Sequence, residues 1–202
     1  MNQNTLTIEK EPFIDVTRLS EGEREEMLKL GMLSRADDIQ PYAPPSVNGE
    51  RAPMQKRAVH VPDVLNEAYD YLKPSSFSRA LCLDFNGYKV LLISGTASVD
   101  EQGRSIHIGD FRAQCWRTYR NISVILEAEG MTWHDMVRTT CYLRDIERDY
   151  KDFNEVRTAF FSWLGLEPLP ASTGIQARLC RDDLLVEIEA IAIVQSHAKE
   201  KS

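Results

Sequence analysis

The sequence contains no apolar run close to the roughly 20 residues that cross a bilayer as a helix. Its first residues, MNQNTLTIEKEPF, lack the basic and then apolar order of a secretory signal. Lysine and arginine form no cluster, and the net charge of -7 opposes binding to a phosphate backbone, which needs a basic face. We therefore expect a soluble, cytoplasmic protein that binds neither membranes nor nucleic acid and takes a small molecule or protein partners instead.

Cysteine and histidine are scarce, with four of each in 202 residues. The cysteines are Cys82, Cys115, Cys141 and Cys180, and the histidines are His60, His107, His134 and His197. No pair of cysteines has the C-x-x-C spacing of a metal or redox site, and a histidine site would need distant elements to converge. The sequence predicts no metal, no cofactor, and reduced cysteines in the core.

The first 73 residues differ in pattern from the rest of the chain. Ser20 to Glu23 form a capping-box pattern before REEMLKL, and Gly31 is placed to end this short helix. A polar, Pro-rich stretch follows, and then DVLNEAYDYL, a second helix candidate that Pro74 closes. We expect residues 1–73 to form a helical and irregular arm, residues 74–196 the main domain, and residues 197–202 a disordered tail.

From residue 75 onward the hydrophobic pattern is regular. ALCLDF and YKVLLISG flank Asn86-Gly87, a dipeptide that favours a tight hairpin turn. Two stretches, Asp110 to Gly130 and YKDFNEVRTAFFSWLG, have helical spacing, and MVRTTCYLR between them alternates with a period of two. The strands ASTGIQARL and LLVEIEAIAIV come last. This order predicts an α/β two-layer sandwich, in which two helices cover one face of a mixed or mostly antiparallel sheet.

The last predicted strand, LLVEIEAIAIV, is apolar at nearly every position on both of its faces. Two helices can cover only one side of the sheet. We therefore expect other subunits to bury the second side.

Several short motifs, in order, resemble the RidA family, also called YjgF. They are LLISGTAS followed by GD, RNISVILEAEGMTWHDMVRTTCYLRDI, DFNEVRTAFF, PLPAS and VEIEAIAI, and they cover about residues 76–194. The resemblance implies a chorismate-mutase-like fold and a homotrimeric barrel with sites in the clefts between subunits. It also implies hydrolysis of reactive enamine and imine intermediates to a 2-oxoacid and ammonia.

Two positions depart from the RidA pattern. The family has an arginine directly after Pro-Ala, which grips the substrate carboxylate, and this chain has Ser172 there. The family tyrosine near the start of the domain is replaced by Phe77, while Asn154 and Glu187 fall where the family has functional residues. The resemblance therefore implies a RidA-like protein whose substrate differs from that of a standard imine deaminase.

The same segments, together with a strand that ends in Cys-Arg, also resemble the C-terminal half of the chorismatases, which hydrolyse chorismate. The arm of 73 residues is much shorter than the N-terminal half of a chorismatase. The resemblance therefore makes chorismate a substrate to test, but the shorter arm means that it does not assign chorismate as the substrate.

The predicted site lies on the last two strands. If they pair as a hairpin across residues 180–183, Gln176 lies opposite Glu187 and Arg178 is diagonal to it. A carboxylate in a partly dry cleft can serve as a general acid or base, and a guanidinium can hold a carboxylate with two hydrogen bonds. We therefore assign Glu187 as the acid or base and Arg178 as a candidate anchor.

Period-two alternation adds further candidates to this face. Ser172, Gly174 and Gln176 share it, with Glu189 from the partner strand. Gly174 leaves space for a ligand, and the hydroxyls of Ser172 and Thr173 are suited to binding, since no histidine stands near to activate them.

Other interpretations of these residues stay open. Glu187 and Arg178 could form an ion pair at a trimer interface, Asn154 could cap its helix, and an exposed face would explain Glu189 equally well. The leading hypothesis is a homotrimeric RidA-like enzyme that acts hydrolytically on a small carboxylate-bearing metabolite. The alternative is a non-catalytic trimer that binds a metabolite or docks a partner; a ribonuclease is disfavoured by the acidic balance.

Overall fold

The computed structural model describes residues 14–42, 54–71 and 74–195, and it divides the chain into two compact units, residues 1–51 and 52–202. In the first unit, helix α1 spans Glu21–Lys29. The Ser20 hydroxyl accepts a hydrogen bond from the Glu23 backbone and the Glu23 carboxylate accepts one from Ser20, so the predicted capping box is confirmed. Leu33 is the one buried side chain among residues 14–42, so this segment has little core of its own.

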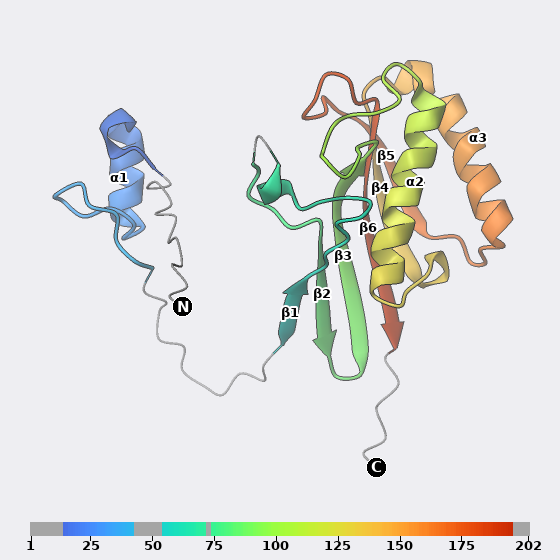
Figure 1. The fold of residues 1–202 in the computed structure, drawn as a ribbon, viewed down its shortest axis with the longest axis horizontal. Helices are drawn as coiled ribbons and strands as arrows, with labels where there is room; N and C mark the ends of the chain where they lie inside the picture. Colours follow the sequence, from blue (N-terminus) through green and yellow to red (C-terminus); the bar gives the residue numbers. More distant parts are fainter. Residues whose placement is uncertain (1–13, 43–53, 72–73, 196–202) are drawn as a thin grey trace, which may run out of the picture. The chain divides into compact units, whose positions relative to one another are not determined.

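The second unit holds a six-stranded sheet and two long helices (Figure 1). The strands are β1 (Gln55–Ala58), β2 (Ala80–Phe85), β3 (Tyr88–Ala97), β4 (Met136–Leu143), β5 (Ala171–Gln176) and β6 (Val186–Gln195), in the spatial order β1-β2-β3-β6-β4-β5. Neighbouring strands are antiparallel except β4 and β5, which run parallel. Helices α2 (Phe111–Ala128) and α3 (Ile146–Leu164) lie on the same side of the sheet (Figure 1). The predicted fold, a mixed α/β sheet with two helices on one face, is confirmed.

Local signals in the sequence explain where these elements begin and turn. Asn86 and Gly87 have φ values of 49° and 77°, as the predicted β2–β3 hairpin requires. The Asp110 side chain accepts a hydrogen bond from the backbone of Ala113 and caps α2. Helix α3 begins at Ile146, earlier than the predicted start at Tyr150, because the preceding aspartate supplies its N-cap.

The predicted hairpin between the last two strands is wrong. Strand β5 pairs with β4, and β6 is inserted between β3 and β4. Two features explain this arrangement. Helix α3 forms a crossover that returns the chain parallel to β4. Strand β6 is long and largely apolar, and it lies in the interior of the sheet, where Val186, Ile188 and Ala192 have no exposed surface.

The second predicted helix is also wrong. Its described part, residues 63–71, forms turns and a short 3-10 helix at Ala68–Asp70. Leu65 and Ala68 are 1% exposed, and β1 just before them pairs with β2, so tertiary packing replaces helical periodicity here. The compact unit therefore begins at residue 52 and includes residues that the predicted boundary at 73/74 assigns to the arm. The predicted tail, residues 197–202, lies outside the described residues.

The core lies between the sheet and the two helices. Tyr119 of α2 stacks on Phe160 of α3 with ring centroids 4.7 Å apart, and Trp133 meets Phe160 edge-on at 5.1 Å. Another short 3-10 helix, Trp133–Asp135, carries that tryptophan. Three of the cysteines are buried and unpaired as expected, whereas Cys180 is exposed in the loop before β6.

Within the described residues of the second unit, 54–71 and 74–195, both long helices lie on one face of the sheet and no helix covers the other, which we call the open face (Figure 1). Leu92 of β3 and Ile193 of β6 are 37% and 40% exposed there. Within residues 14–42, 54–71 and 74–195, no helix is both long and apolar enough for a membrane crossing.

Candidate functional site

The structure separates the predicted site residues into two groups. Strand β5 pairs in register with β4, so that Ser172 and Gly174 lie beside Thr139 and Cys141 on the helix side of the sheet. Thr173 lies beside Thr140 on the open face, and Glu187 pairs with Tyr142 on that same face.

The predicted neighbourhood of Gln176, Arg178 and Glu187 does not form. Gln176 lies next to Leu143, and its side-chain oxygen accepts a hydrogen bond from the backbone of Ile146 at 3.1 Å. The Arg178 side chain is 87% exposed, and among the described residues its one ion-pair partner is Asp182, at 4.0 Å. The physical reason is the strand order, because β4 separates β5 from β6.

Glu187 lies in the middle of the sheet, between Ala97 of β3 and Tyr142 of β4. Its carboxylate occupies the space above Gly95, since a Cβ atom at Gly95 would stand 1.9 Å from Glu187 Oε1. Burial disfavours the ionised carboxylate and raises the pKa of Glu187 above its usual range, while Arg79 and Arg181 oppose this rise. A partly dry carboxylate with such a pKa can both accept and donate a proton.

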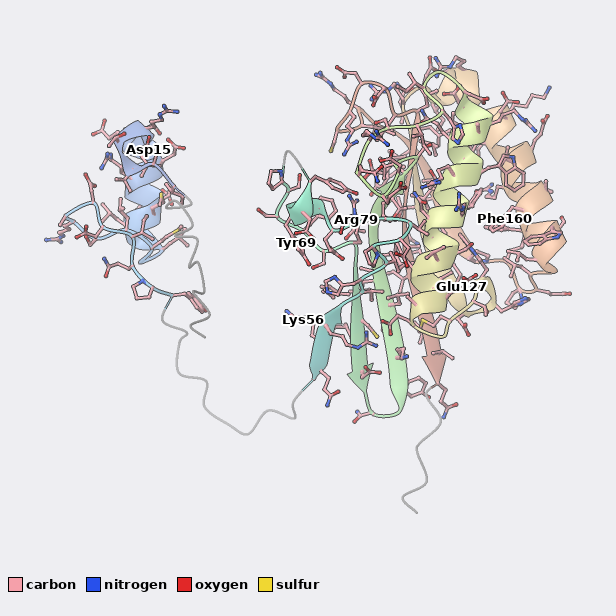
Figure 2. All side chains as sticks on the ribbon, in the orientation of Figure 1. Asp15, Lys56, Tyr69, Arg79, Glu127 and Phe160 are labelled. Atoms are coloured by element: carbon pink, nitrogen blue, oxygen red, sulfur yellow. The ribbon has the colours of Figure 1, made fainter. Side chains whose placement is uncertain are left out.

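Arg79 is a buried cation that the sequence analysis missed. Its side chain donates to the Tyr71 hydroxyl at 2.6 Å and to the Asn66 carbonyl at 3.1 Å, and it is 6% exposed. Phe77 lies 5.1 Å from the guanidinium carbon, in cation–π range. Figure 2 shows Arg79 next to the segment that carries Tyr69. Arg79 therefore contributes to the electrostatic environment of Glu187. The apolar ring of Phe77 packs against the Arg79 guanidinium.

A groove runs along the open face near Glu187. Its volume is about 540 Å³, and its polar lining includes Ser94, Arg138, Thr140 and Glu189. Arg138 donates a hydrogen bond to the Thr173 hydroxyl at 3.2 Å. The predicted binding residue Thr173 therefore lies next to the polar lining of this groove.

The second group lies where α3 meets β5. The Ser172 hydroxyl accepts a hydrogen bond from Arg157 at 3.2 Å and another from the Thr139 hydroxyl at 3.0 Å. Arg157 also donates to the Asn154 side-chain oxygen at 2.5 Å. Asn154 therefore orients Arg157 and does not cap the helix, whose N-cap is Asp145.

Cys141 and Gly174 border this second group. Cys141 Sγ lies 3.8 Å from the Ser172 hydroxyl, but burial raises the pKa of the thiol, which disfavours a thiolate nucleophile. A Cβ at Gly174 would meet the Tyr150 ring at 3.5 Å, an ordinary contact, so this glycine leaves only a small space.

Comparisons with known proteins agree with this fold. A family model described as endoribonuclease L-PSP matches residues 73–194. A RutC family protein of Pyrococcus horikoshii is 35% identical over 102 residues, which is 50% of this chain and 77% of that protein. The 3-aminoacrylate deaminase RutC of Acinetobacter baylyi is 31% identical over 105 residues, 52% of this chain and 79% of that protein.

A further relative and a solved structure extend the comparison. The 2-iminobutanoate/2-iminopropanoate deaminase of Salmonella typhimurium is 30% identical over 104 residues, covering 52% of this chain and 79% of that protein. The crystal structure of RidA from an Antarctic Psychrobacter matches with a TM-score of 0.55 and 25% identity, over 68% of this chain and 99% of that one. Because the family model covers more than half of the chain, this protein belongs to the endoribonuclease L-PSP family, which is the RidA or YjgF family that its motifs predict.

Proposed function

We propose that this chain is a RidA-like enzyme that hydrolyses a small carboxylate-bearing metabolite, with Glu187 as the proton-transfer group. The observation that carries the proposal is the Glu187 carboxylate itself, which lies partly buried over Gly95 with a raised pKa and is under the electrostatic influence of Arg79 and Arg181. The names of two relatives, which describe deaminases of small unsaturated or imino acids, support the substrate class.

The chemistry can be written for a 2-imino acid. Glu187 as a carboxylate removes a proton from water, whose oxygen bonds to the imine carbon while the C=N electrons move to nitrogen. The protonated Glu187 then gives its proton to that nitrogen, which yields a neutral carbinolamine. In a second transfer Glu187 takes the proton of the new hydroxyl and passes it to the amine nitrogen, so that the C=O bond forms as the C–N bond breaks and ammonia leaves. The overall change is imine plus water to 2-oxoacid plus ammonia, so the protein consumes no other reactant.

The purified protein is expected to accelerate ammonia release from 2-iminopropanoate generated in the cuvette by an amino acid dehydratase. The rate is compared with spontaneous hydrolysis in buffer and with an equal amount of Glu187→Gln protein. A parallel reaction with chorismate, followed as pyruvate release, tests the chorismatase resemblance. Saturable binding without turnover of either substrate would contradict the proposal and favour the non-catalytic alternative.

We further propose that the protein is a homotrimer whose sites lie between subunits. The apolar residues of the open face support this, because Leu92 and Ile193 are exposed in a single chain. Sedimentation is expected to give three times the chain mass of 23.1 kDa. Leu92→Asp is expected to shift the protein to monomers, because it would bury a charge in the interface. A monomeric wild-type protein would contradict the trimer.

A further inference from the structure

The proposed substrate carries a carboxylate, yet the residue directly after Pro-Ala is Ser172, which has no charge. Some other cation must hold the substrate carboxylate if the proposed function is correct. Five arginines stand near the predicted site residues. Arg138 lies on the open face, on the other side of the sheet from Ser172, and Arg181 already donates to the Gly103 carbonyl. The other three are Arg79 near Glu187, Arg178 just after β5, and Arg157 on α3. Their burial and their contacts distinguish them.

Arg79 and Arg178 are poorly suited to gripping a ligand. Arg79 is 6% exposed, and its guanidinium already donates to Tyr71 and Asn66. The opposite holds for Arg178, whose side chain is 87% exposed and lies 4.0 Å from the Asp182 carboxylate, so bulk water would screen its charge.

Arg157 has the intermediate environment that anion binding needs. It projects from α3 toward β5 and donates to Ser172 at 3.2 Å and to Asn154 at 2.5 Å, and its guanidinium carbon lies 5.1 Å from the Phe153 ring centre. These partners are neutral, and within the described residues no carboxylate lies within ion-pair distance of Arg157. Of the five N–H donors of an arginine, the two used here leave the others available.

The surrounding hollow has room for a small acid. It lies between α3 and β5 with a volume of about 890 Å³, and Tyr150, Phe161, Pro168 and Gly174 line it together with Arg157 and Ser172. All residues of β5 are exposed, so a ligand can reach the guanidinium from solvent. The Ser172 hydroxyl, fixed by Arg157 and Thr139, adds a polar group at the same point.

We propose that Arg157 is the carboxylate-binding residue of this protein, delivering from helix α3 the guanidinium that other members of the family carry on the strand at the position of Ser172. This inference rests on the proposed function for the class of ligand and on the proposed trimer. Within one chain, Ser172 beside Arg157 and Glu187 lie on opposite faces of the sheet. The guanidinium and the carboxylate can therefore meet one small substrate only if different subunits supply them. The proposal predicts that an arginine introduced at position 172 restores the carboxylate binding that is lost when Arg157 is removed.

The test is calorimetric titration with pyruvate, the 2-oxoacid product of the assay above. Arg157→Gln is expected to weaken pyruvate binding by about 10- to 100-fold, the usual loss when a charge-assisted hydrogen bond is removed. Adding Ser172→Arg to Arg157→Gln is expected to restore most of the affinity. The matched control is Arg112→Gln, which removes an exposed arginine that contacts Asp152 and Glu155. Thermal melts of all variants show whether each is folded.

Unchanged affinity in a folded Arg157→Gln protein would overturn the inference, as would an equal loss in Arg112→Gln. A wild-type protein that hydrolyses the imine but has no Arg157-dependent affinity for pyruvate also overturns it, and leaves the proposed function standing. Conversely, Arg157-dependent pyruvate binding without any turnover supports the carboxylate site while the hydrolytic function fails.

Discussion

Glu187→Gln is expected to reduce turnover of 2-iminopropanoate by about 100- to 10,000-fold, the usual contribution of a positioned acid or base. Glutamine has the same shape and fits the same space over Gly95, so the fold and the binding groove are retained. The loss is therefore expected in kcat, while the Kd for pyruvate stays close to that of the wild type. Single-turnover kinetics and calorimetry on the same preparation measure the two quantities.

The same substitution has an expected effect on stability that follows from the direction of the pKa shift. The pKa of Glu187 is raised in the folded protein. The contribution of its protonated form to the free energy of unfolding is therefore fully present below the pKa of the unfolded state, and it is lost as pH rises through the pKa of the folded state. Wherever Glu187 is ionised, its burial therefore destabilises the folded state. Glu187→Gln is expected to melt at the same temperature as the wild type or higher at pH 7, with the difference disappearing in acid.

Activity should show the matching pH dependence. If Glu187 acts as a base, kcat/KM falls with decreasing pH at a value above the usual range of a glutamate. An active Glu187→Gln enzyme, or a marked loss of stability in this variant at pH 7, would show that the carboxylate has a structural role instead.

The sequence specifies the elements of this fold better than their order in the sheet. The Asn86-Gly87 turn and the apolar stripes of the two helices are local features, and the structure confirms them. The position of β6 between β3 and β4 depends on long-range pairing, which period-two alternation in β5 and β6 cannot reveal. The length of α3 was the available signal, because strands joined through a helix commonly run parallel.

The same limitation affected the candidate site. Glu187 is predicted because it falls where the RidA family has a functional residue, whereas its expected partner Arg178 was placed by a hairpin that does not exist. Arg157 was missed, although it follows Asn154 by three residues on a helix and therefore shares a face with it. Arg79 could not be anticipated, because the segment that buries it was interpreted as a helix.

Gly95→Ala is expected to separate activity from stability. The new Cβ would stand 1.9 Å from Glu187 Oε1 and 2.9 Å from its carboxyl carbon, so the carboxylate must move. It is the end of a flexible side chain, and its burial in the ionised form is already unfavourable, so a shift of the melting temperature by only a few degrees is expected. Turnover is expected to fall by about 100-fold, because a displacement of about 1 Å is enough to spoil a catalytic geometry.

The control for Gly95→Ala is Gly22→Ala in helix α1, where an added Cβ meets nothing within 4 Å and should leave both turnover and melting unchanged or slightly improved. The double variant Gly95→Ala with Glu187→Gln carries the decisive comparison. If the glycine acts only by giving Glu187 its position, the double variant is no slower than Glu187→Gln alone. A double variant that turns over more slowly than Glu187→Gln alone would instead mean that the substrate itself occupies the space over Gly95. Displacement of the Glu187 carboxylate could not cause that additional loss, because the double variant has no carboxylate there.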